Sequence, residues 1–217
     1  MESPRRRDAE ATAQRDACRL GVATILLLLP LAVWMWLAMM LVHELGHVAA
    51  AGATGGRVVY VNVYPGQLSS TLVRPNPRPG VVLWAGLLGG WLVPAGIAAV
   101  ASRAPRLVRR TLEAWAAFCL LAGGAYLAVG GVERLTDTGK LVAAGWPAPL
   151  LIAIGSTAAI GGYAWSRRVW PRLLSNLTRQ PPTRLAIATA WLLLTAWIAG
   201  QWWLAWWIAT GLSQRMN

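Results

Sequence analysis

The residues best suited to carry out chemistry form one short segment, His43-Glu44-Leu45-Gly46-His47. Residues four positions apart on an α-helix lie about 40° apart around its axis, so both imidazoles would project from one face. With this spacing two histidines can bind a single Zn²⁺ ion at about 2.0–2.1 Å. Glu44 would project about 100° from His43, where it can hydrogen-bond a zinc-bound water without ligating the metal. The segment predicts a zinc site in which Glu44, as general base, activates that water.

A catalytic zinc ion takes three protein ligands and keeps one position open. Because the chain has only two histidines, the third ligand must be a carboxylate or a thiol. Asp137, which precedes an apolar stretch and has small neighbours, is the preferred candidate, although the same context suits a helix N-cap. Glu133 is the alternative. Cys119 lies among apolar residues, as a packed core thiol does, and Glu113 lies among arginines, as an ion-pairing residue does.

The rest of the chain has the composition of an integral membrane protein. Hydrophobic residues make up 56% of its 217 residues and charged residues 13%, against about 25% charged in soluble domains. After a polar N-terminal arm at residues 1–19, five uncharged stretches are each long enough to cross a bilayer as a helix. They are 20–42, 79–102, 114–132, 141–166 and 185–214. We therefore expect an all-α polytopic membrane protein with a single membrane-embedded domain over residues 20–214.

The position of Glu44 strengthens the zinc hypothesis. The segment His43–His47 directly continues the first apolar stretch, and an acidic side chain at mid-membrane costs about 2.5–3.5 kcal/mol on insertion scales. A carboxylate between two histidines at that depth therefore favours metal binding. The alternative interpretation is that the helix ends by Val42 and that the three polar residues lie in a wet interface.

Two further local features bear on how the site is built. Residues 57–64 are rich in β-branched and aromatic side chains, Pro65-Gly66 is a turn signal, and residues 67–73 can form the returning strand. This pattern predicts a short β-hairpin after the first membrane helix. In the second stretch, Gly86 and Gly90 form a GxxxG pair, which suits either close helix packing or a role beside the site.

The composition also excludes several classes of function. The net charge of +12 could indicate nucleic-acid binding, but the arginines are scattered between apolar stretches, as in loops at a membrane surface. Cys18 and Cys119 form neither a disulfide framework nor a CxxC knuckle. Two histidines are too few for a diiron membrane oxidase, and the other stretches hold no second ligand cluster for a zinc transporter. The expected partner is the lipid bilayer, with no nucleic acid.

Taken together, these features resemble the site-2 protease superfamily of intramembrane zinc metalloproteases, and most of all its short bacterial branch of membrane metallopeptidase-like proteins. The resemblance covers roughly residues 20–165, and the HELGH segment is its most specific part. The other matching features are Ala-Ala-Ala-Gly-Ala-Thr-Gly-Gly-Arg after that segment, the hairpin, the glycine-bearing second stretch with Ala85-Gly86-Leu87-Leu88-Gly89-Gly90, and an aspartate ahead of a later stretch.

The resemblance implies a role for each candidate residue. By this similarity His43 and His47 correspond to the zinc ligands of the family, Glu44 to its general base and Asp137 to its aspartate ligand. The implied activity is that of a zinc metalloendopeptidase, hydrolysing a peptide bond in or near the spanning segment of a membrane-anchored protein substrate. The hairpin would hold that substrate as an added strand. The implied location is a bacterial plasma membrane, which the protein crosses several times.

One motif departs from the family pattern. The third-ligand motif usually has Asn and Pro ahead of Leu-Asp-Gly, whereas residues 135–139 of this chain read Leu-Thr-Asp-Thr-Gly. The asparagine that assists substrate positioning therefore has no obvious counterpart. The alternative function is a catalytically inactive membrane protein with a structural or partner-binding zinc site.

Charge and resemblance predict opposite orientations in the membrane. If the stretches alternate, 14 of the 20 basic residues lie on the same side as the N-terminus, which favours a cytoplasmic N-terminus. In the better-known family members the metal site lies toward the cytoplasm. Because HELGH closes the first stretch, that placement implies an external N-terminus.

Overall fold

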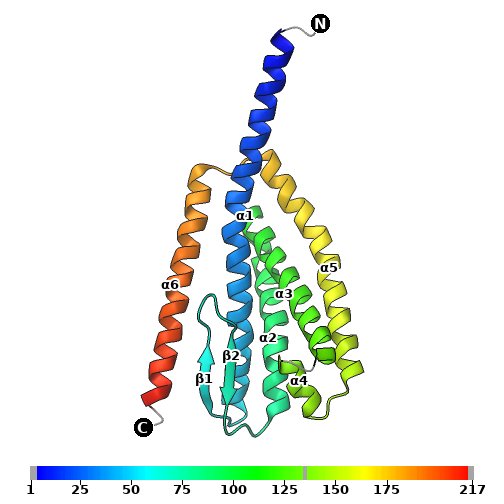
Figure 1. The fold of residues 1–217 in the computed structure, drawn as a ribbon, viewed down its shortest axis with the longest axis vertical. Coiled ribbons are helices and arrows are strands. Elements are labelled where there is room, and N and C mark those ends of the chain that lie inside the picture. Colours follow the sequence, from blue (N-terminus) through cyan, green and yellow to red (C-terminus); the bar gives the residue numbers. More distant parts are fainter. Residues whose placement is uncertain (1–3, 134–135, 215–217) are drawn as a thin grey trace.

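The computed structural model describes residues 4–133 and 136–214, which fold into a bundle of long helices with one small hairpin (Figure 1). The 3₁₀ turn Ala101–Arg103 separates the second and third helices. The elements in chain order are α1 (Pro4–Ala53), β1 (Val58–Asn62), β2 (Ser70–Val73), α2 (Pro79–Val100), α3 (Arg106–Glu133), α4 (Thr136–Ala143), α5 (Ala148–Arg179) and α6 (Arg184–Gln214).

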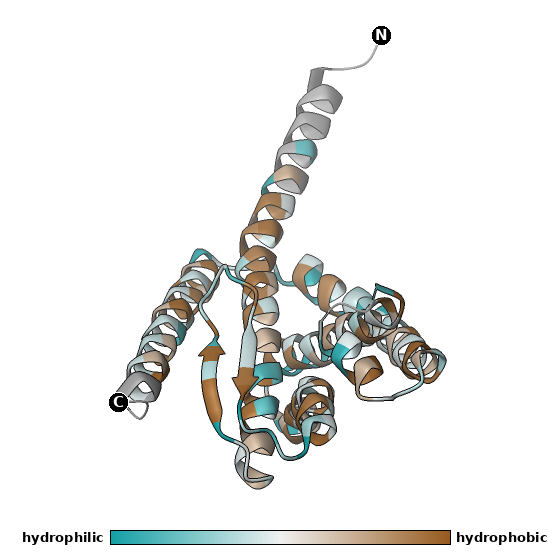
Figure 2. Cartoon of the chain, turned by 60° about the horizontal axis from the view of Figure 1, so that its bottom comes forward, coloured by the Kyte–Doolittle hydropathy of each residue, from teal (hydrophilic) through white to brown (hydrophobic). Residues whose placement is uncertain are grey.

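Five of these helices are long and apolar enough to cross a membrane. Their candidate spans are Cys18–Ala53, Pro79–Arg103, Arg106–Glu133, Ala148–Arg179 and Arg184–Gly211. Figure 2 shows apolar residues along the lengths of these helices, and large side chains such as Ile160 and Leu192 are exposed on the outside of the bundle. Exposed apolar side chains on long helices are what a lipid environment requires. The prediction of an all-α polytopic fold with a hairpin after the first helix is confirmed.

Helix α1 carries the HELGH segment well inside its length. It starts at Pro4, so the polar residues of the N-terminal arm from Pro4 onward are helical, and it continues through His47 to Ala53. The alternative that the helix ends by Val42 is wrong. The helix ends in a Schellman motif, in which Gly55 has a φ of +76° and the Gly56 N–H donates to the Ala51 carbonyl at 2.8 Å.

The bundle is held together by close helix crossings at small residues. Helices α3 and α5 pack along much of their length, and a Cβ at Gly124 would lie 2.4 Å from the backbone nitrogen of Ala159. A Cβ at Gly155 would in turn lie 2.5 Å from the backbone nitrogen of Ala128. Such crossings require glycine, because only backbones without side chains can approach so closely in a membrane.

The hairpin has the predicted strand order but shorter strands. β1 and β2 pair antiparallel with Tyr60 opposite Leu72, and Gly66 in the turn has a φ of +85°. Helix α6 packs against β1, where the Gln201 side chain donates to the Val63 carbonyl at 2.8 Å. Because α6 lies beside β1 and α1 contacts β2, the hairpin is fixed between two helices (Figure 1).

The fourth apolar stretch, predicted as 141–166, is divided between two helices. α4 ends at Ala143, Gly145 turns the chain with a φ of +93°, and α5 begins at Ala148 as its flanking prolines predict. The reason is that proline suits the first turn of a helix but not its interior. The short helix α4, which starts with Asp137 in its first turn, is thereby set against α3 and α2.

Candidate metal centre

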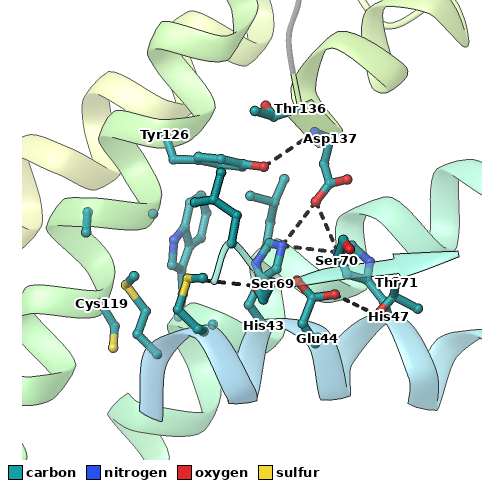
Figure 3. Close-up of a pocket in the computed structure, with 18 of the residues that line it drawn as sticks. His43, Glu44, His47, Ser69, Ser70, Thr71, Cys119, Tyr126, Thr136 and Asp137 are labelled. Carbon is teal, nitrogen blue, oxygen red and sulfur yellow. Dashed lines mark hydrogen bonds and ion pairs between the residues drawn. The ribbon is translucent and has the colours of Figure 1, made fainter. Parts of the chain in front are cut away.

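Three potential ligand atoms converge where α1 meets α4. His43 Nε2 lies 3.0 Å from Asp137 Oδ2, and His47 Nε2 lies 3.1 Å from the same oxygen. The two imidazole Nε2 atoms are 3.1 Å apart. Figure 3 shows both rings on the same side of α1, pointing up toward the Asp137 carboxylate. The fold thus brings together three of the predicted site residues, two of them ninety positions or more from the third.

The distances and the donor chemistry both fit a zinc ion. Two ligands of a tetrahedral zinc at 2.0–2.1 Å stand roughly 3.3–3.4 Å apart, within a few tenths of an ångström of the separations here. Two imidazole nitrogens and one carboxylate oxygen are also a donor set of catalytic zinc sites, which keep a fourth position open. His43, His47 and Asp137 are therefore the residues that would hold the metal.

The tautomer of His47 is set by the neighbouring helix. Its Nδ1 lies 2.8 Å from the Val82 carbonyl oxygen on α2. Because a carbonyl can only accept, Nδ1 carries the proton, and a neutral ring then has its lone pair on Nε2. Histidine ligands commonly donate their second nitrogen to a carbonyl in this way, which fixes the ring for metal binding.

Asp137 is held as a carboxylate. Burial raises the pKa of this carboxyl, but a hydrogen bond from His43 and the positive charge of Lys140 act against burial, and the pKa lies well below its usual range. The ligand is therefore already deprotonated across the physiological pH range, as metal binding requires.

Glu44 is buried beside these ligands without belonging to their cluster. It is only 3% exposed, and its Oε2 accepts a hydrogen bond from Thr71 Oγ1 on β2 at 2.5 Å. The hairpin thus fixes the position of the predicted general base.

His43, Glu44, His47 and Asp137 line one cavity of about 380 Å³, a size typical of small-ligand sites. Ser69, Ser70 and Thr71 of the hairpin form another part of its wall, as Figure 3 shows. Most of the remaining wall is apolar and comes from α1, α2 and α3. Its large side chains are Trp36, Met39, Met40, Leu87, Trp91 and Tyr126, and Leu68 of the hairpin lies in the same wall.

Gly86 and Gly90, the GxxxG pair of α2, pack against both histidines. The two predicted roles of the pair, close helix packing and a place beside the site, therefore both apply. A Cβ at Gly86 would lie 2.3 Å from the His47 ring, and one at Gly90 would lie 3.9 Å from His43 Nδ1. On α1, directly before His47, a Cβ at Gly46 would lie 2.3 Å from the Ala85 carbonyl oxygen of α2. Glycine at these positions lets α2 approach α1 closely enough to reach His47.

We expect Gly86→Ala to weaken zinc binding and to destabilise the fold, since the added methyl group overlaps the His47 imidazole. Overpacking of this kind typically costs about 1–3 kcal/mol. Zinc affinity and the thermal unfolding midpoint of the purified protein measure the two effects. Gly96→Ala on the same helix is the matched control, because a Cβ there has nothing within 4 Å. Equal behaviour of the two variants would contradict this packing role.

The remaining sequence candidates lie outside the cluster. Glu133 is exposed at the end of α3, and Glu113 forms ion pairs with Arg110 at 2.5 Å and Arg109 at 3.8 Å, as its neighbours predicted. Cys119 is buried and contributes to the cavity wall.

Sequence reasoning missed three contributors to the site. Thr71 binds Glu44, and Lys140 Nζ lies 3.1 Å from Asp137 Oδ1. The Tyr126 hydroxyl accepts a hydrogen bond from the Asp137 N–H at 3.5 Å, and its ring packs edge-on against His43. None of them belongs to a recognisable motif. The i, i+3 spacing of Asp137 and Lys140 on one helix was the only available signal.

The fold and the site together define a multi-pass helical membrane protein with a two-histidine, one-aspartate donor set in the wall of one cavity. The family model described as Peptidase M50B-like matches residues 18–128, just over half of the chain. This chain therefore belongs to that family of site-2-protease-type peptidases, as its resemblance predicted. The match includes HELGH, the hairpin and α2, and it ends before Asp137. Comparisons with curated proteins and with solved structures found no match.

Proposed function

We propose that this protein is an intramembrane zinc metalloprotease that hydrolyses a peptide bond in or near the spanning segment of a membrane-anchored protein. The observation that carries the proposal is the convergence of His43 Nε2, His47 Nε2 and Asp137 Oδ2 in a cavity that also contains the buried Glu44. Family membership supports a peptidase, and the five apolar helices support a site within the membrane.

The side chains around the cavity have complementary tasks in this reaction. Zinc, held by His43, His47 and Asp137, would supply a Lewis acid that can polarise a carbonyl and lower the pKa of water to about 7. Glu44 accepts the proton of the attacking water and returns it to the leaving amide nitrogen. Thr71 holds one oxygen of Glu44, and the surrounding wall is mostly apolar, a setting in which charge interactions are stronger than in bulk water.

The hairpin offers a place for the substrate backbone. Within the described residues β2 pairs only with β1, and the segment Ser69–Thr71 lines the cavity. Helix α6 packs against β1, whereas Ser70 and Thr71 of β2 line the cavity, so strand addition is directed to β2. An extended substrate segment paired with β2 would pass beside Glu44, because Thr71 contacts that carboxylate. We infer that the substrate is unwound locally and bound as a third strand.

The exposed apolar surface of the helices supports a location in a membrane, and the family resemblance points to a bacterial plasma membrane. In this proposal the lipid bilayer surrounds the helices, and a membrane-anchored substrate reaches the cavity by moving within the bilayer.

The basic residues at the α2–α3 and α5–α6 connections lie toward the end of the bundle where α1 begins (Figure 1). The histidines of α1 lie toward the opposite end.

A metal-removal experiment tests the proposed reaction. The protein is reconstituted in liposomes with a set of single-span reporter proteins whose spans contain helix-destabilising Gly and Pro residues. We expect cleavage within or near the span, loss of cleavage to the protein-free rate after treatment with a zinc chelator, and recovery on adding zinc. Cleavage unaffected by chelation and loss of zinc would contradict the proposal. Bound zinc without cleavage of any reporter would favour the inactive, structural or partner-binding alternative.

A further inference from the structure

Lys140, the one lysine of the chain, lies one helical turn after Asp137 on α4. Its Nζ is 3.1 Å from Asp137 Oδ1, while the other oxygen of the same carboxylate, Oδ2, faces the two imidazoles. The two carboxylate oxygens of Asp137 therefore have different partners. One is bound by an ammonium group and the other converges with the histidine nitrogens.

This separation matters for how a metal would be held. A carboxylate can ligate through one oxygen or through both, and a catalytic zinc site must keep a position free for water or substrate. If both oxygens of Asp137 ligated the metal together with His43 and His47, four positions would be filled by protein atoms, and water or substrate could enter only as a fifth ligand. An ammonium group on Oδ1 competes with this second metal bond.

The backbone around Asp137 is fixed independently of Lys140. Thr138, which is 0% exposed, packs against α3, where a Cβ at Gly130 would lie 2.8 Å from the Thr138 side chain. The Tyr126 hydroxyl accepts a hydrogen bond from the Asp137 N–H. These contacts set the place of α4, and the rotation of the Asp137 carboxylate is left to its side-chain partners.

We propose that Lys140 is a positioning residue of the metal centre. It binds Oδ1 of Asp137, so that Asp137 ligates zinc through Oδ2 alone and one coordination position stays open. The inference rests on the proposed metal site but goes beyond it, since it concerns the number of donor atoms rather than the identity of the ligands. A plain ion pair is the competing explanation: the Lys140 side chain is 62% exposed, and exposed ion pairs contribute little to stability.

The test compares Lys140→Met and Lys140→Arg with the wild-type protein. Zinc affinity is measured by competition with a chromophoric chelator, and coordination number by the visible spectrum of the cobalt-substituted protein. We expect the zinc affinity of Lys140→Met to differ from that of the wild type by about 10- to 100-fold, the size of effect that residues orienting metal ligands have. Its cobalt bands should weaken, as they do when a four-coordinate ion becomes five-coordinate. Lys140→Arg, which keeps a cation near Oδ1, should retain the wild-type spectrum.

A second measurement avoids dependence on the folding of a variant. An amine-selective acetylating reagent modifies Lys140 and the terminal amine of the folded wild-type protein, and Lys140→Arg reports the effect of every other modification. We expect acetylated wild type to behave as Lys140→Met and acetylated Lys140→Arg to stay unchanged. A wild-type spectrum and affinity in both Lys140→Met and the acetylated protein would overturn this role while leaving the metal site intact. A wild-type protein that binds neither zinc nor cobalt would overturn both.

Discussion

Glu44→Gln is expected to abolish proteolysis while zinc stays bound. Glutamine has the size of glutamate and can still accept a hydrogen bond from Thr71, so the cavity keeps its shape. It cannot take a proton from water at neutral pH, and general-base catalysis typically contributes about 10²–10⁴-fold to a rate. We therefore expect a loss of at least about a hundredfold in cleavage rate, with zinc content equal to that of the wild type.

The measurement is cleavage of a reporter in liposomes, with zinc determined in the same preparations. Glu113→Gln is the matched control: it makes the same substitution on α3, where Glu113 pairs with Arg110. This control should cleave at the wild-type rate. A Glu44→Gln protein that cleaves as fast as the wild type would remove Glu44 from the mechanism.

Asp137→Ala is expected to cause a large loss of zinc affinity. Structural zinc sites bind with an apparent free energy of about 10–16 kcal/mol, so one donor in four accounts for roughly 2.5–4 kcal/mol, or about 10²–10³-fold in affinity. Asp137 also contacts both histidines, so its removal frees their rings as well as deleting a ligand. Equilibrium dialysis of zinc against the purified variant and wild type measures the change.

Glu133→Ala provides the control for Asp137→Ala. Glu133 was the other acidic candidate, but it is exposed and lies outside the donor cluster. Its removal should leave zinc affinity within error of the wild type. Unchanged affinity in Asp137→Ala, or a loss confined to Glu133→Ala, would show that the third ligand has been wrongly assigned.

The parts of this protein that could be predicted from sequence are those encoded by local periodicity. Long uncharged stretches predict membrane helices because the bilayer imposes one length and one backbone solution. HELGH predicts two imidazoles on one helix face, since four residues nearly complete a turn. The strand residues around Pro65-Gly66 predict a hairpin, because turn chemistry and β-branched side chains act over a few positions.

The partners of these residues could not be predicted in the same way. The contact of Thr71 with Glu44 and that of Val82 with His47 depend on how separate elements pack, and neither residue has a distinctive local pattern. Asp137 could be selected from sequence because the chain has so few acids, but its approach to the histidines depends on how α4 packs against α3 and α2. The GxxxG pair, Gly86 and Gly90, is a similar case. Its spacing predicted close helix packing, but it could not predict that the two histidines of α1 are the side chains packed against it.

X-ray absorption at the zinc edge of the purified wild-type protein tests the central claim most directly. The claim is that His43, His47 and Asp137 hold one zinc ion and leave one position open. We expect one zinc per chain with two imidazole nitrogens, one carboxylate oxygen and one non-protein oxygen, all at about 2.0–2.2 Å. A spectrum with a sulfur donor or four protein ligands, or a protein that retains no zinc, would contradict the account.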